Sequence, residues 1–459
     1  MTSPSPSPGE HPAVSPCPPA RPEVETLTAY SAPLEGRRGL LRLDFNENTV
    51  GPSPKVVAAV RAIPADHYAI YPEYDGLREA VIASLVAEAA TDTGSATGPG
   101  SASGGGSASA TGPSSEPDTE SPPSSGTLTP AHIGLFNGVD EALHAVFHAY
   151  GAAGERLLTT SPTFGYYTPC ARMQGMEIEA IPYRLPGFAF PFEEIQAALG
   201  GAATPAALAA SATPTALSAT APRLLLICNP NNPTGTRLAP HRILELAAAA
   251  PGTLVVVDEL YEAFTGDSVL PLLLAEAGGA ATAGVAPTGA ATAGEATAAG
   301  TDPFAAYPNL LVLRSLAKTA GLAGLRFGFA VGTPALVDRV SRVSGPYDVN
   351  SFAVTAAHAA LADQAYTDAY VAEVLRARDW LLEHLVAAGV RHHAAGGNYL
   401  LLWPRRPAAA VEAELRAAGI LVRSMAGKPL IDGSLRVSLG TTEQMATFWA
   451  AYRRIEGLA

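Results

Sequence analysis

The feature that most constrains this fold is a series of short strand patterns, two of which are continuously apolar. Strands are expected at 133–136, 156–160, 178–181, 223–228, 253–257, 310–313 and 326–331, and the continuously apolar ones are 223–228 and 253–257. A strand that is apolar along its whole length must be covered on both faces, as in a parallel sheet between helices. Helical patterns, such as 139–150, separate most of these runs. The alternation predicts an α/β fold in which a mostly parallel central sheet carries helices on both faces.

The pattern changes after residue 334. Long helices are expected at 334–343 and 351–388, and short strands at 399–403 and 435–439. This mixture predicts a smaller C-terminal α+β domain. We therefore expect an N-terminal arm and large domain over 37–335 and a small domain over 336–459.

Four segments have compositions that bury too little apolar surface to offset chain entropy. Residues 1–36 are rich in Pro, Ser and Glu, and we predict a disordered tail there. Inserts at about 91–128, 201–221 and 277–302 consist mainly of small residues and proline. The rest of the 459 residues is ample for a sizeable core.

Charge and composition exclude several classes of partner. The formal net charge of −13 argues against nucleic acid and anionic membranes. No uninterrupted apolar run is long enough to span a bilayer, and the first residues do not form a signal peptide. The cysteines, Cys17, Cys170 and Cys228, are scattered and lack metal-ligand spacing. We expect a cytoplasmic protein without a metal site.

Polar residues follow four of the predicted strands, where ligands bind in open parallel sheets. These segments are Asn-Gly-Val-Asp-Glu at 137–141, Asn-Pro-Asn-Asn-Pro-Thr-Gly at 229–235, Asp-Glu-Leu-Tyr at 258–261 and Arg-Ser-Leu-Ala-Lys at 314–318. Each segment alone also has an ordinary structural interpretation, as a helix cap, a surface turn or a surface lysine. Their combination is more informative than any one of them.

Together the four segments predict a site for pyridoxal 5'-phosphate (PLP). Lys318 has small apolar neighbours, and burial would lower the pKa of its amine and favour the neutral nucleophile that forms a Schiff base. Asp258 ends a buried strand, where an unpaired carboxylate is costly. The helix start at 137–141 offers backbone N–H groups to an anion. PLP needs a lysine, an acid at the pyridine nitrogen, donors to the ring oxygen and a phosphate site.

The order of these motifs resembles the class I/II aminotransferases, which are PLP enzymes of fold type I. The matching motifs are Asn-Pro-Thr-Gly at 232–235, Asp-x-x-Tyr at 258–261 and Ser-x-x-Lys at 315–318, with arginine eight residues later at 326. Within that family the chain is most similar to the histidinol-phosphate aminotransferase branch. That likeness rests on segments 43–48, 51–54, 71–73, 137–141, 346–350, 419–423 and 435–441.

The resemblance implies a role for each residue around the cofactor ring. Lys318 would hold the cofactor covalently and then move the proton as base and acid. Asp258 would pair with the pyridine nitrogen. Tyr261 and Asn232 would donate to the ring oxygen, and Phe164 would stack on the ring.

The resemblance also implies the residues that bind the cofactor phosphate. Val139 and Asp140 would offer backbone amides, and Ser315 and Arg326 would contribute side chains. Tyr71 would reach the phosphate of the neighbouring subunit, which makes a homodimer the expected assembly.

Three further residues are implied on the substrate side. Arg436 would bind a substrate carboxylate in bidentate fashion. Arg423 would bind the second anionic group, the phosphate of histidinol phosphate. Asn46 is the third candidate in the substrate site.

Three functions are compatible with this pattern. The first is transamination between histidinol phosphate and 2-oxoglutarate, a step of histidine biosynthesis. The second is an aromatic or broad-range aminotransferase, and Arg423 distinguishes the two because a phosphate requires it and an aromatic ring does not. The third is a PLP decarboxylase of a phosphorylated amino acid, which could share every cofactor residue.

The compositional argument makes a direct prediction for the first insert. Deleting residues 95–125 should leave folding and activity nearly intact, because the segment has too few apolar residues to belong to a core. The measurement is the yield of soluble protein, its melting temperature and its turnover beside the full chain. Loss of soluble protein would show that the insert is structural.

Overall fold

The computed structural model describes residues 18–27, 35–93, 127–200, 221–279 and 302–458. Most of the predicted tail and of the three predicted inserts lies outside these residues. One part of the predicted tail is described: α1 (Pro22–Glu25) is a single helical turn, and the Arg21 guanidinium donates to the carbonyl of Met173 at 3.0 Å. The prediction of an unstructured tail is therefore wrong for this turn.

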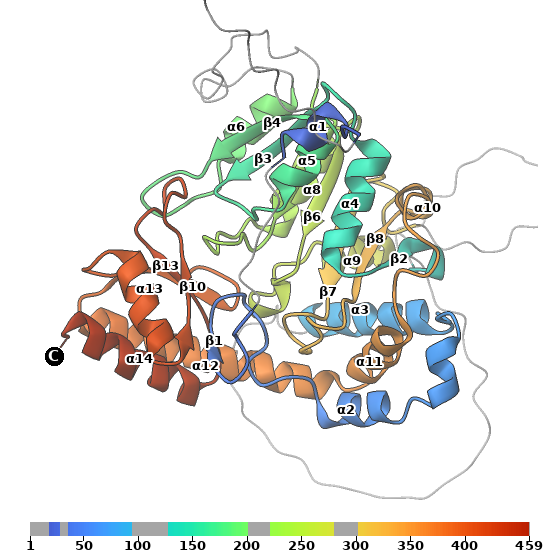
Figure 1. The fold of residues 1–459 in the computed structure, drawn as a ribbon. Helices are drawn as coiled ribbons and strands as arrows, with labels where there is room; N and C mark the ends of the chain where they lie inside the picture. Colours follow the sequence, from blue (N-terminus) through green and yellow to red (C-terminus); the bar gives the residue numbers. More distant parts are fainter. Residues whose placement is uncertain (1–17, 28–34, 94–126, 201–220, 280–301, 459) are drawn as a thin grey trace, which may run out of the picture.

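A central sheet organises the larger unit of the described chain (Figure 1). In these residues it has seven strands in the order β2-β8-β7-β6-β5-β3-β4. Their bounds are β2 Ile133–Phe136, β8 Gly328–Gly332, β7 Leu310–Ser315, β6 Leu254–Asp258, β5 Leu224–Cys228, β3 Arg156–Ser161 and β4 Glu177–Pro182. Strands β7, β6, β5, β3 and β4 pair in parallel, whereas β8 is antiparallel to both β2 and β7. The predicted mostly parallel sheet is confirmed.

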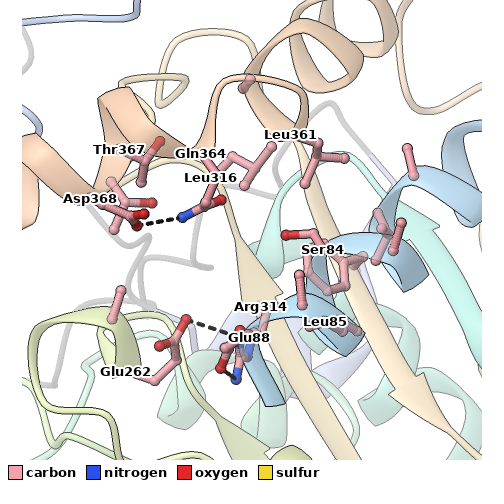
Figure 2. A pocket seen from close by; sticks show the side chains of 18 of the residues that line it. Ser84, Leu85, Glu88, Glu262, Arg314, Leu316, Leu361, Gln364, Thr367 and Asp368 are labelled. Carbon is pink, nitrogen blue, oxygen red and sulfur yellow. Dashed lines mark hydrogen bonds and ion pairs between the residues drawn. The ribbon is translucent and has the colours of Figure 1, made fainter. Parts of the chain in front are cut away.

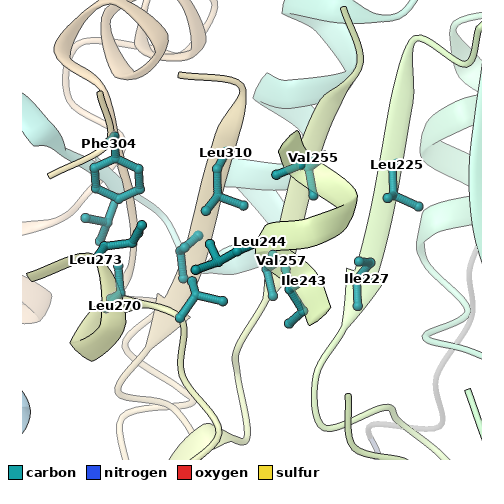
Figure 3. Close-up of a cluster of buried hydrophobic side chains, with 14 of the residues drawn as sticks. Leu225, Ile227, Ile243, Leu244, Val255, Val257, Leu270, Leu273, Phe304 and Leu310 are labelled. Atoms are coloured by element: carbon teal, nitrogen blue, oxygen red, sulfur yellow. The ribbon is translucent and has the colours of Figure 1, made fainter. Parts of the chain in front are cut away.

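Helices cover both faces of this sheet, as the apolar runs predicted. Val255 and Val257 of β6 belong to the core on one face, while Leu254 and Val256 belong to the core on the other. The first core includes residues of α3 (Leu77–Thr93), α6 (Phe192–Leu199), α8 (Pro240–Ala249), α9 (Leu270–Gly279) and α11 (Ser351–Leu361). Figure 3 shows the part of this core where α8 and α9 pack on β5, β6 and β7. The second core includes residues of α4 (Val139–Tyr150), α5 (Tyr167–Met173) and α10 (Pro334–Ser341).

The C-terminal residues form a smaller unit with its own core. Its described sheet has the order β12-β13-β10-β9 and is antiparallel throughout. The bounds are β9 Arg391–His393, β10 Tyr399–Trp403, β12 Arg423–Ser424, β13 Leu435–Ser438, α12 Gln364–Ala387, α13 Ala408–Ala417 and α14 Thr442–Glu456. Helix α14 starts with a capping box of Thr441 and Gln444 and is followed by Gly457 at a φ of +62°, the usual signals at helix ends.

The N-terminal arm, residues 37–52, packs on the smaller unit rather than on the sheet that follows it in sequence. Strand β1 (Leu41–Arg42) pairs in parallel with β11 (Ile420–Leu421), and Leu43 is fully buried in the core of the smaller unit. The chain then passes to α2 (Pro54–Arg61), whose Val56 packs with Ala356 and Ala360 of α11. The arm thus connects the two units beside the strand ends of the central sheet. The short 3-10 turns are η1 Ala65–Ala69, η3 Pro130–His132 and η4 Glu262–Phe264.

Several boundaries differ from the sequence prediction. The helix expected at 351–388 is two helices, α11 and α12, interrupted at Ala362 and Asp363. The interruption has a physical reason, because α11 packs on the large core and α12 on the small one. The strand expected at 326–331 begins only at Gly328, since Arg326 adopts a φ of +61° and turns the chain. The helix expected from Phe164 begins at Tyr167.

The domain boundary expected between residues 335 and 336 stays a prediction. Helices α10 and α11 both bury side chains against the larger unit, so this packing continues to Leu361. None of the described helices has the length and apolar character needed to cross a membrane.

Candidate active site

The carboxyl ends of β5, β6 and β7 lie side by side at one edge of the sheet. Cys228 is in register with Asp258, and Asp258 is in register with Leu313. The polar segments that follow these strands therefore begin next to one another. The structure thus brings together the segments at 229–235, 258–261 and 314–318, as the sequence predicted.

Lys318 lies half-buried in the loop after β7. Its Nζ donates to the backbone carbonyl of Phe45 at 3.0 Å and lies 6.0 Å from the centre of the Tyr261 ring. Burial, followed by the positive charge of Arg436, lowers the pKa of the Lys318 amine to about 8. The neutral amine, which a nucleophile requires, is therefore far more populated near physiological pH than in a lysine of ordinary pKa.

Asp258 is 1% exposed at the end of β6. Its carboxylate accepts hydrogen bonds from the Tyr167 hydroxyl at 2.7 Å and from the Leu260 amide at 3.2 Å. Burial raises the pKa of Asp258 to about 6, although these hydrogen bonds oppose the shift. A cationic ring nitrogen nearby would favour the carboxylate form. The sequence reasoning missed Tyr167, for which the aromatic cluster at 164–167 is the available signal.

Tyr261 connects the large unit to the arm and to Arg436. Its buried hydroxyl accepts from the Asn46 side-chain amide at 3.1 Å and from the Asn232 side-chain amide at 3.2 Å. Asn232 in turn accepts from Arg436 Nη1 at 2.8 Å, while Arg436 Nη2 donates to the carbonyl of Asp44 at 2.5 Å. Four predicted residues from distant parts of the sequence thus form one network.

Asn398 and Ser438 were missed by the sequence reasoning, although both take part in this network. The Asn398 side chain donates to the Asn46 carbonyl at 3.0 Å, and the Ser438 hydroxyl donates to Asn46 Oδ1 at 2.9 Å. Both side chains are fully buried. Their polarity at the ends of two apolar strands, directly before β10 and at the last residue of β13, is the signal that could have identified them.

The residues predicted to bind the cofactor phosphate meet at the start of α4. Gly138 precedes the helix with a φ of +81°, and a Cβ there would come within 2.5 Å of Arg326 Nη2. Arg326 donates to Asp140 Oδ2 at 2.9 Å. The Ser315 hydroxyl donates to the Phe327 carbonyl at 2.7 Å and accepts from the Ala317 amide. A helix N-terminus with an arginine beside it suits a phosphate group, and the positive φ before the helix favours glycine at position 138.

Two predicted residues lie apart from this network. Phe164 is half-buried, and its ring makes an edge-on contact with Tyr167 at 5.5 Å between ring centres. Tyr71 is 70% exposed and stacks on Tyr347 with 4.1 Å between ring centres. In the single chain, no described contact joins Tyr71 to the residues around Lys318.

Arg423 lies directly opposite Arg436, because the two residues are partners in the antiparallel register of β12 and β13. Opposite residues in such a pair share one face of the sheet. The Arg423 guanidinium carbon lies 5.6 Å from the centre of the Phe45 ring. Two cations thus occupy neighbouring positions beside the arm.

Arg314, in β7, forms ion pairs with residues that follow β6 and so links the ends of the two strands. It contacts Glu259 at 3.1 Å, Glu88 at 2.7 Å and Glu262 at 3.0 Å, and its Nη2 donates to the Ser268 hydroxyl. Arg314, Glu88 and Glu262 line one end of a cavity of about 770 Å³ between α3, η4 and the start of α12 (Figure 2). Burial raises the pKa of Glu262 to about 8. The Arg314 contacts fix the β6 and β7 ends that carry Asp258 and Lys318.

The fold and these residues together define a PLP enzyme of fold type I. The family model described as aminotransferase class I and II matches residues 125–451, and the chain belongs to that family. Its cofactor is PLP, and its members transfer amino groups between amino donors and 2-oxo acids.

Individual relatives agree with this family. Histidinol-phosphate aminotransferase 1 of Pseudomonas fluorescens is 27% identical over 411 residues, which cover 88% of this chain and 90% of the relative. The structure of the Sinorhizobium meliloti histidinol-phosphate aminotransferase in complex with PLP matches with a TM-score of 0.69 at 20% identity, covering 96% and 99% of the two chains. The L-threonine-O-3-phosphate decarboxylase of Porphyromonas gingivalis matches with a TM-score of 0.61 at 19% identity, covering 91% and 99%.

The residues present fit the cofactor. Its parts require a lysine of lowered pKa, a buried carboxylate, a tyrosine hydroxyl and a helix start beside an arginine, and the site has all four. When bound, PLP supplies an electron sink for the carbanion at the substrate Cα.

The pKa of Lys318 leads to a prediction for the reaction of the apoenzyme with PLP. Only the neutral amine attacks, so the second-order rate should rise with pH and level off with a midpoint near pH 8. Arg436→Met removes a positive charge that lowers this pKa, and the midpoint should move upward. Stopped-flow absorbance across this pH range measures it, with Arg391→Met, on the far strand of the same sheet, as the control. A wild-type midpoint at the ordinary lysine value would contradict the burial argument.

Asp258→Ala should retain some PLP, because Lys318 is intact, but should lose at least about 100-fold in turnover. Tyr167→Phe removes only one hydrogen bond to the same carboxylate, and its loss should be about 3- to 10-fold. Bound cofactor and steady-state turnover are measured side by side. Full activity of Asp258→Ala would contradict its place in the site.

Proposed function

We propose that the protein transfers the amino group of histidinol phosphate to 2-oxoglutarate, giving imidazole-acetol phosphate and glutamate. The observation that carries the proposal is the pairing of Arg423 with Arg436 across β12 and β13. Like charges directly opposite each other are unfavourable in a sheet. A substrate with strongly anionic groups would offset that repulsion.

Both substrates of this reaction suit two arginines. Histidinol phosphate has a phosphate and no carboxylate, whereas 2-oxoglutarate, like the product glutamate, has two carboxylates. Arg436 already donates to Asn232 and to the carbonyl of Asp44, so its planar head is held beside Tyr261. We assign Arg436 to the carboxylate and Arg423 to the phosphate, and place Asn46 beside them through its bond to Tyr261.

The residues around the ring would act as follows. Lys318 would bind the cofactor and then carry the proton to and from the substrate Cα. Asp258 would hold the positive charge at the ring nitrogen. Tyr261 and Asn232 would hydrogen-bond the ring oxygen, and Phe164 would cover one face of the ring.

The cofactor phosphate would be bound at the start of α4. The backbone amides of Val139 and Asp140 lie in the first turn of that helix. Arg326 would add a cation and Ser315 a hydroxyl. Arg326 bonds to Asp140 in the structure, so it is held at the helix start.

We further propose a homodimer in which Tyr71 reaches the phosphate site of the other subunit. The support is a surface that a single chain leaves uncovered. Tyr68, Ile70, Tyr71 and Tyr347 are all more than half exposed, with Tyr71 stacked on Tyr347. Exposed aromatic clusters of this kind mark protein interfaces.

Two alternatives use the same machinery. An aromatic aminotransferase would not need Arg423 for its donor. A decarboxylase of a phosphorylated amino acid would need Arg423 but would release carbon dioxide. The similarity to the Porphyromonas gingivalis decarboxylase shows that the same fold serves that chemistry, so products must be measured.

The test compares three amino donors, histidinol phosphate, phenylalanine and O-phosphothreonine, each with 2-oxoglutarate as the acceptor. The rates of formation of glutamate and of carbon dioxide are measured. We expect glutamate from histidinol phosphate at a kcat/KM far above that for phenylalanine. Arg423→Leu should lower kcat/KM for histidinol phosphate by about 10- to 150-fold, the range for a hydrogen-bonded charge, and that for phenylalanine by much less. Arg391→Leu, an exposed arginine of the same sheet, is the matched control.

Preference for phenylalanine would move the function to aromatic transamination and leave the role of Lys318 intact. Carbon dioxide from O-phosphothreonine without glutamate would make the protein a decarboxylase. Equal losses on both donors in Arg423→Leu would contradict the phosphate assignment.

A further inference from the structure

Phe45 occupies a position in the arm that the proposed roles do not use. Its carbonyl accepts the Lys318 amine at 3.0 Å. Its half-buried ring lies 4.4 Å from the Arg37 guanidinium carbon and 5.6 Å from that of Arg423. One residue thus touches the cofactor lysine with its backbone and the candidate phosphate-binding arginine with its ring.

Arg37 is built into the arm by four hydrogen bonds. It is 9% exposed and bonds to both carboxylate oxygens of Asp44, at 3.0 and 2.7 Å, and of Glu47, at 3.1 and 2.9 Å. Arg42 adds a further bond to Glu47 at 3.1 Å. Burial opposes ionisation of Glu47, but its bonds to Arg37 and Arg42 outweigh burial and lower its pKa. Asp44 and Glu47, which flank Phe45 in the sequence, are therefore both bonded to the Arg37 guanidinium. That guanidinium also packs on the Phe45 ring.

The backbone on the C-terminal side of Phe45 is fixed as well. Asn46 has a φ of +56°, which few residues other than glycine and asparagine adopt readily. Its amide donates to the Ser438 hydroxyl at 2.8 Å, and its carbonyl accepts from Asn398 at 3.0 Å. The ring at position 45 is consequently presented by a rigid turn, as a binding residue should be.

We propose that Phe45 forms an aromatic wall of the substrate side-chain subsite and thereby favours donors with a planar ring. Arg37 is the positioning residue that holds this wall. In histidinol phosphate the imidazole and the phosphate are on separate branches of the carbon that bears the amine. With the amine at Lys318 and the phosphate at Arg423, the imidazole branch would pack on Phe45, which contacts both residues. Aromatic rings in contact gain free energy beyond burial of their area, so an imidazole ring gains where an alkyl chain does not. This inference rests on the proposed function for its donor.

The test uses two donors that differ only in the ring. Histidinol phosphate and 2-aminobutyl phosphate share the amine and the phosphate, but the second has a methyl group in place of the imidazole. The measured quantity is the ratio of their kcat/KM values in the PLP-loaded enzyme. Phe45→Leu keeps an apolar side chain and removes the ring face, so this ratio should fall by about 2- to 12-fold. Phe190→Leu, the same change at a half-buried phenylalanine outside the network, should leave the ratio at its wild-type value.

The outcomes separate this inference from the function on which it rests. An unchanged ratio in Phe45→Leu, including equal losses on both donors, would overturn the aromatic wall. If the wild type rejects histidinol phosphate and uses phenylalanine, the proposed function fails. The same ratio for phenylalanine and 2-aminobutyrate then tests Phe45, and a selective loss for phenylalanine supports it.

Arg37 has a separate test, because it acts through Phe45. Arg37→Met should lower the histidinol phosphate to 2-aminobutyl phosphate ratio in the same direction as Phe45→Leu. Arg37→Lys retains a charge but not the planar fork, and its ratio should lie between Arg37→Met and wild type. A fall in melting temperature with an unchanged ratio would make Arg37 a structural residue only and would remove it from the proposal.

Discussion

The burial of two ionisable groups, Lys318 and Asp258, at one edge of the sheet is the constraint on which the rest of the structure depends. Withdrawing either group from water disfavours its charged form, and the pKa values of about 8 and about 6 record that cost. Both groups follow parallel strands that pair in register, and Arg314 ties those strand ends together through Glu259. The fold thus keeps a nucleophilic amine and an acid ready for one ligand.

The second requirement is that the smaller unit packs against this edge of the sheet. The backbones of Gly235 and Gly396 are in close contact, and a Cβ on Gly235 would lie 2.7 Å from the Gly396 carbonyl oxygen. Close by, the Tyr399 hydroxyl donates to the Asn231 carbonyl at 2.7 Å. The arm also joins the two units, because Asn46 is hydrogen-bonded both to Tyr261 of the larger unit and to Ser438 of the smaller unit. The glycine of the Asn-Pro-Thr-Gly motif therefore serves packing between the units as well as the loop itself.

The sequence predicted that much of this network would lie together because its residues occur in local motifs. Buried strands such as β6 can be recognised as apolar runs, and polar residues that follow them indicate the edge of the sheet where a ligand binds. Partners that act across the sequence were harder to predict. In the sequence, Tyr167 is an ordinary helix residue and Asn398 an ordinary turn residue, and only the fold brings them to Asp258 and Asn46. The break between α11 and α12 was missed for the same reason, since it depends on which core each helix meets.

The most direct test of the account is to identify the lysine that holds the cofactor. PLP-loaded protein would be reduced with borohydride, digested and analysed by mass spectrometry for the pyridoxyl phosphate label. The account predicts that the label is on the peptide containing Lys318 and is lost in Lys318→Ala, while Lys55, exposed and paired with Asp363, stays unlabelled. A label on another lysine, or undiminished labelling in Lys318→Ala, would contradict the assignment from which the rest of the site was built.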